Sequence, residues 1–150
     1  MNLKVTLEEK LLNAMRNNEV IERNTIRMVL TSIKLAEVER GKSLEDNEII
    51  SILQKEIKMR KETILEAEKG NRTDIIQTTQ EEIRVLENYL PKQMGVDEIR
   101  VIIAKIIADL NAIDIKDMGK IMKVAVPEIA GKASNDLISQ TVREMLTEKK

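Results

Sequence analysis

Three lysines in the second half of the chain are spaced like neighbours on one side of a helix: Lys116, Lys120 and Lys123. At about 100° of rotation per residue they share one narrow sector, and apolar residues of the same segment fall on the opposite side: Met118, Ile121, Met122 and Ala125. Three ammonium groups on one face could contact nucleic-acid phosphates. The alternative interpretation is that they are the solvated face of an ordinary amphipathic helix.

The residues that follow, Gly131-Lys132-Ala133-Ser134, lead into another expected helix. The N-terminus of a helix offers unpaired amides and the positive end of the helix dipole, and Lys132 adds a cation beside it. These features suit a phosphate oxygen. The alternative is that Gly131 only makes a turn and that Ser134 only caps the helix.

Arg60 interrupts an apolar stripe at a position where a hydrophobic residue is expected, the stripe being Ile50, Leu53, Ile57 and Ile64. One interpretation is a phosphate or partner contact, assisted by Lys58 and Lys61. The other is a snorkelling side chain or an ion pair with Glu56, which lies one turn earlier.

A further basic group shares a sector beside the apolar stripe of an earlier helix: Arg23, Arg27 and Lys34. Charges that flank the apolar face of an amphipathic helix are the ordinary explanation for such a group. It is therefore not included among the candidate site residues.

The residue types that catalysis most often uses are missing. The 150 residues include no His, no Cys, no Phe, no Trp and one Tyr. Thiolate chemistry, imidazole general-base catalysis and Cys- or His-based metal sites are thereby excluded. Carboxylates are abundant, but no pair is singled out as a cation site. We therefore predict no catalytic residues, no metal site and no cofactor.

The overall charge is nearly balanced, with 25 basic and 26 acidic residues. A nucleic-acid contact therefore requires a local patch rather than a uniformly basic surface. The first ten residues lack the apolar core of a signal peptide, and no apolar run approaches the roughly 20 residues needed to cross a bilayer. From the sequence alone we expect a soluble cytoplasmic protein without membrane contact.

Glycine and proline divide the chain into helices, so an all-α fold is predicted. Thr6-Leu7-Glu8-Glu9 matches a capping box at the start of the first helix. The second helix runs from about Val20 to Arg40, where Gly41 ends it. Ser43-Leu44-Glu45-Asp46 marks the start of a long third helix that Gly70 closes. The fourth follows in heptad register until Pro91, so the third and fourth should form a hairpin.

The segment Pro91–Gly95 is the expected domain boundary. We predict N-terminal helical hairpins or a bundle in residues 1–90, and a small three-helix domain in residues 91–150. Asp114 and Ser134 are expected to cap the last two helices.

Motifs along the whole chain resemble the GatB/YqeY family and are closest to the free-standing YqeY-like proteins. The matching residues are Ala14-Met15, Arg23, Ile26-Arg27-Met28-Val29, Arg60, Gly70, Arg72-Thr73-Asp74-Ile75, Tyr89-Leu90-Pro91-Lys92-Gln93-Met94, Asp117-Met118-Gly119-Lys120-Ile121-Met122, Pro127 and Gly131-Lys132-Ala133.

This resemblance implies a C-terminal domain similar to the tail of the GatB subunit of glutamine-dependent aminoacyl-tRNA amidotransferase, a tail that assists tRNA recognition. Nothing in the chain resembles the amidase site or the ATP-dependent module of that carbon–nitrogen ligase. A non-catalytic accessory protein is therefore expected. The implied partners are tRNA and a tRNA-charging or amidotransferase protein.

Two hypotheses remain open from the sequence. In the first, the chain contacts the tRNA backbone through Lys116, Gly119, Lys120, Lys123, Gly131, Lys132 and Ser134, because there are almost no aromatic rings to stack on bases. In the second, it is a protein-interaction adaptor or a self-associating helical module without RNA binding, based on the heptad seam of the third and fourth helices. The oligomeric state stays open.

Overall fold

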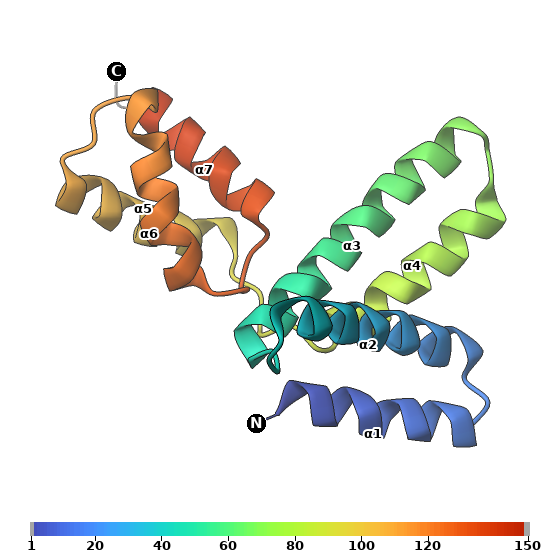
Figure 1. Cartoon of the computed structure of the whole chain (residues 1–150). Helices are drawn as coiled ribbons and strands as arrows, with labels where there is room; N and C mark the ends of the chain where they lie inside the picture. The colour runs from blue at the N-terminus through green and yellow to red at the C-terminus, as the bar shows by residue number, and fades with distance from the viewer. Residues whose placement is uncertain (1, 149–150) are drawn as a thin grey trace. The chain divides into compact units, whose positions relative to one another are not determined.

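The structure is a computed structural model that describes residues 2–148 (Figure 1). The prediction of an all-α fold is confirmed, since these residues form helices and connecting turns with no strand. The chain divides between Leu90 and Pro91 into an N-terminal unit and a C-terminal unit. The helices of the N-terminal unit are α1 (Leu3–Arg16), α2 (Val20–Arg40), α3 (Asp46–Lys69) and α4 (Thr73–Glu87).

Two side-chain contacts define how α1 and α2 pair. The Lys4 ammonium lies 2.7 Å from the Glu37 carboxylate. Arg27 donates a hydrogen bond to the Met15 sulfur, 3.7 Å away. Position 4 therefore faces position 37 and position 15 faces position 27, so the two helices run antiparallel.

The predicted capping box at Thr6 is wrong. Helix α1 begins one turn earlier, because the Asn2 side chain accepts a hydrogen bond from the amide of Val5 at 3.2 Å. Thr6 lies inside the helix, where its hydroxyl donates to the Asn2 carbonyl. Asn2 is as good a capping residue as threonine, and it precedes the first helical residue.

Two of the expected helix boundaries are close to those observed. Gly41 ends α2 with a φ of 70°, in the left-handed region that glycine adopts without strain. Helix α3 begins within the expected start segment, where Glu45 is the N-cap and forms a capping box with Glu48. The turn between α3 and α4 differs in detail, because Asn71 rather than Gly70 takes the left-handed conformation.

The core of the N-terminal unit draws residues from all four of its helices, including Leu7, Ile26, Ile33, Ile49, Leu53 and Leu86. On α3 the fully buried residue of the first turn is Ile49, whereas Ile50 of the expected stripe is only half-buried. The observed stripe places Arg60 among the buried residues of that helix.

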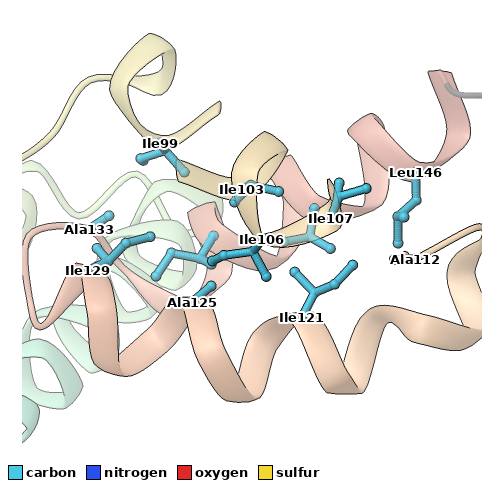
Figure 2. Packing of buried hydrophobic residues seen from close by; sticks show 12 residues of the cluster. Ile99, Ile103, Ile106, Ile107, Ala112, Ile121, Ala125, Ile129, Ala133 and Leu146 are labelled. Carbon is cyan, nitrogen blue, oxygen red and sulfur yellow. The ribbon is translucent and has the colours of Figure 1, made fainter. Parts of the chain in front are cut away.

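The C-terminal unit consists of α5 (Val96–Leu110), a 3₁₀ turn η1 (Ile115–Asp117), α6 (Met118–Ile129) and α7 (Asn135–Glu148). Its core combines isoleucines of α5 with residues of α6 and α7, including Ile103, Ile106, Ile121, Ala125, Ile138 and Val142. Figure 2 shows Ile121 pointing from α6 toward Ile106 and Ile107 of α5.

One of the two caps expected in this unit is confirmed. The Ser134 hydroxyl accepts a hydrogen bond from the Leu137 amide at 3.1 Å, at the start of α7. Asp114 instead caps η1, because its carboxylate accepts from the Lys116 amide at 2.9 Å. Helix α6 therefore begins only at Met118.

Candidate nucleic-acid interface

Lys120 and Lys123 lie on the exposed side of α6, as the spacing predicts. On the other side of the helix Ile121, Ala125 and Ile129 are completely buried. The packing of these three residues therefore points both ammonium groups toward solvent, and the Lys120 side chain is 75% exposed. Lys116 is also exposed, but it belongs to η1 and not to the same helix.

Asp117 lies where η1 ends and α6 begins, and its carboxylate makes two contacts there. One carboxylate oxygen accepts a hydrogen bond from the Ile113 amide at 2.8 Å, and the other lies 4.0 Å from the Lys120 ammonium. The Ile113 hydrogen bond lowers the pKa of Asp117 most, and the Lys120 charge adds a smaller effect in the same direction. A long ion pair to a lysine that is mostly exposed contributes little stability, so Lys120 is only loosely held.

We expect the carboxyl group of Asp117 to titrate below its ordinary value of 3.8 in the folded protein. Because the folded pKa is the lower one, the contribution of this carboxylate to stability is complete above the unfolded pKa and is lost as pH falls through the folded one. An NMR titration of the Asp117 carboxyl carbon measures the midpoint. A peptide of residues 113–120 is the unfolded reference, and equal midpoints in peptide and protein would contradict the assignment.

The loop between α6 and α7 turns sharply through two left-handed residues, Ala130 (φ 47°) and Gly131 (φ 81°). It then enters α7, where the Ser134 cap occupies the Leu137 amide and Asp136 adds an acidic residue to the first turn. A carboxylate at this end of the helix already interacts with the dipole. The geometry thus favours the turn-and-cap interpretation of Gly131 and Ser134. The Lys132 side chain remains exposed.

The first residues of the C-terminal unit are hydrogen-bonded to this loop. The Gln93 side chain donates to the carbonyl of Gly131 at 3.0 Å, and the Met94 amide donates to the carbonyl of Lys132 at 2.7 Å. These two hydrogen bonds hold the segment that contains Lys92 beside Lys132, and the Lys92 side chain is exposed. Sequence reasoning missed Lys92, because 38 residues of sequence separate the two segments.

Arg60 lies inside the N-terminal unit with 6% of its surface exposed. Its guanidinium donates to the Glu56 carboxylate at 2.7 Å and to the Glu82 carboxylate at 3.3 Å. Its third nitrogen contacts the Met28 sulfur at 3.6 Å. The structure therefore favours the ion-pair interpretation of Arg60, which has no surface for a phosphate, while Lys58 and Lys61 stay exposed on α3.

The model of the family described as "Yqey-like protein" matches residues 4–146, which is nearly the whole chain. The chain belongs to the YqeY-like protein family. The resemblance expected from the motifs is thereby confirmed at the level of the family.

Several fungal proteins are similar to this YqeY-like chain. "Altered inheritance of mitochondria protein 41, mitochondrial" of Kluyveromyces lactis is 32% identical over 109 residues, covering 70% of this chain and 58% of that protein. The protein of the same name from Lachancea thermotolerans is 34% identical over 85 residues, covering 56% and 46%. An uncharacterized protein of Schizosaccharomyces pombe is 28% identical over 91 residues, covering 61% and 74%. The chain thus spans about half the length of the first two relatives.

These relatives correct one prediction made from the sequence. The first two, and a third protein of the same name from Meyerozyma guilliermondii, are named mitochondrial proteins, so the expected cytoplasmic location of this YqeY-like protein is wrong by this comparison. The first ten residues lack the apolar core of a secretory signal, but that pattern does not distinguish a cytoplasmic from a mitochondrial protein. No helix within residues 2–148 is both long and apolar enough to span a membrane.

Proposed function

We propose that this YqeY-like protein is a non-catalytic accessory protein that binds the backbone of tRNA through its C-terminal unit. The observation that supports this most is the outward orientation of Lys120 and Lys123 on α6. Two further exposed lysines, Lys92 and Lys132, lie on two segments of the same unit that are hydrogen-bonded to each other. The motif resemblance to the GatB tail supports tRNA as the nucleic acid.

The available chemistry is phosphate and 2′-hydroxyl contact, which does not read base sequence. The only aromatic side chain of the protein, Tyr89, is half-buried in the N-terminal unit. Burial, assisted by the Glu22 carboxylate, raises the pKa of Tyr89 to about 12, so its phenol stays neutral. With one half-buried ring in the whole sequence, base stacking contributes little, and we expect the affinity to come from basic side chains.

The experiment is tRNA binding by fluorescence anisotropy as a function of salt, with bulk tRNA and with mitochondrial tRNA, because three relatives are named mitochondrial proteins. A protein that neutralises about four phosphates should lose affinity about 10²-fold between 50 and 200 mM salt. In Lys120→Glu/Lys132→Glu we expect at least a roughly tenfold loss of affinity at low salt. We also expect a salt slope that is smaller by one to two units.

The matched control is Lys105→Glu/Arg143→Glu, which makes the same change in net charge at exposed positions of α5 and α7. It should bind tRNA more tightly than Lys120→Glu/Lys132→Glu. Equal losses in the two double variants would show that only net charge matters and would overturn the proposed patch. No measurable binding of the unmodified chain to either tRNA pool would overturn the function itself.

A further inference from the structure

An open apolar groove runs between α1 and α2 of the N-terminal unit, with a volume of about 740 Å³. Leu11, Leu12, Leu30 and Val38 line it, and Lys4, Glu8, Lys34 and Glu37 are the charged residues along it. Leu12 is 52% exposed and Val38 72% exposed. Just outside the groove, Val5 is 46% exposed, one heptad before Leu12. Exposed apolar side chains gathered along a groove with charged residues beside them are typical of an interaction surface.

The walls of the groove carry four charged residues, two from α1 and two from α2. Since position 4 faces position 37 and position 15 faces position 27, Glu8 lies opposite Lys34. Lys4 and Glu37 already pair with each other at one end of the groove. Glu8 and Lys34 make no ion pair among the described residues, although they lie on opposite walls. With Lys4 and Glu37 paired, the charges left along the groove are Glu8 on the α1 wall and Lys34 on the α2 wall.

This surface is complementary to itself. A two-fold axis along the groove would lay α1 of each copy on α2 of the other, in the same antiparallel register that the two helices have within one chain. Val5 would then face Val38 of the partner subunit, Glu8 would face Lys34 of the partner subunit, and Leu12 would face Leu30 of the partner subunit. In this register each contact of the opposite charges of Glu8 and Lys34 lies between two apolar contacts.

We propose that a second copy of this chain covers the groove. The result would be an isologous dimer in which α1 and α2 of both copies form a four-helix bundle with antiparallel neighbours. The net charge of −1 per chain gives almost no long-range repulsion between copies. The dimer is independent of tRNA binding, because it uses only residues of the N-terminal unit.

The test is the oligomeric state of the full chain without RNA, measured by sedimentation equilibrium. We expect a dimer for the unmodified protein. Glu8→Lys and Lys34→Glu should each weaken it on the order of tenfold or more, because each homodimer would twice oppose two like charges. Mixing the two variants should restore dimerisation, because in the heterodimer both contacts at positions 8 and 34 again pair opposite charges.

Controls keep this test decisive. Glu9→Lys on α1 and Lys55→Glu on α3 make the same charge changes at exposed positions outside the groove, and we expect both to dimerise normally. Circular dichroism verifies that every variant is folded. A monomeric unmodified chain would overturn the proposal. So would single variants that dimerise like the controls, or a mixture that stays monomeric.

Discussion

Replacing Arg60 with alanine lowers the free energy of unfolding of the N-terminal unit by about 3–5 kcal/mol, the expected result of removing one partner from a buried ion cluster. The guanidinium carries one positive charge and binds both Glu56 and Glu82, whose side chains are only 12% and 23% exposed. Glu56 also accepts a hydrogen bond from Ser32 of α2, so the cluster joins three helices. Without Arg60, two carboxylates are left close together in a poorly hydrated site.

Urea unfolding of the full chain, followed by circular dichroism, measures this change. The matched control is Lys61→Ala, at an exposed neighbouring position of α3, which should stay within about 0.5 kcal/mol of the unmodified protein. A second variant replaces Arg60, Glu56 and Glu82 together by hydrophobic residues of similar volume. Its stability should be about equal to that of the unmodified protein, or higher. If Arg60→Ala loses no more stability than Lys61→Ala, the cluster is not a structural element.

Local signals in the sequence were sufficient for the fold class and for most helix ends. The break in the apolar stripe at Arg60 was visible in the sequence, and the structure explains it by carboxylates on α3 and α4. The wrong predictions arise where two nearby residues suit the same role and the sequence does not show which one is used. Asn2 and Thr6 are both good capping residues, and the earlier one is used. Ile49 and Ile50 are adjacent and equally apolar, so the packing of α3 decides which is buried.

The candidate site was predictable only where it lies on one element. The outward direction of Lys120 and Lys123 follows from helical periodicity, because the core-facing residues Ile121 and Ala125 lie on the opposite side of α6. The hydrogen bonds from Gln93 and Met94 to the loop at Gly131 and Lys132 were not predictable, because they connect distant segments. Periodicity carries no information on such contacts, and Lys92 was therefore overlooked.

Ile121→Ala should lower the free energy of unfolding of the C-terminal unit by about 2–5 kcal/mol, because its side chain is completely buried between α6 and α5 (Figure 2). Truncation removes apolar contacts and leaves a cavity beside Ile106 and Ile107. A unit of about 60 residues has little stability to lose, roughly 3–9 kcal/mol by the usual value per residue. We therefore expect much of this unit to unfold at moderate temperature.

Hydrogen exchange read by mass spectrometry separates the two units. Amides of α5, α6 and α7 should lose protection in Ile121→Ala, while amides of the buried parts of α2 and α3 keep it. Val124→Ala is the matched control, since Val124 lies on the same helix but is 41% exposed. If tRNA binds to the lysines of α6, its affinity should fall in parallel with protection in Ile121→Ala and not in Val124→Ala. Equal loss of protection in both units would contradict the view that they fold as separate cores.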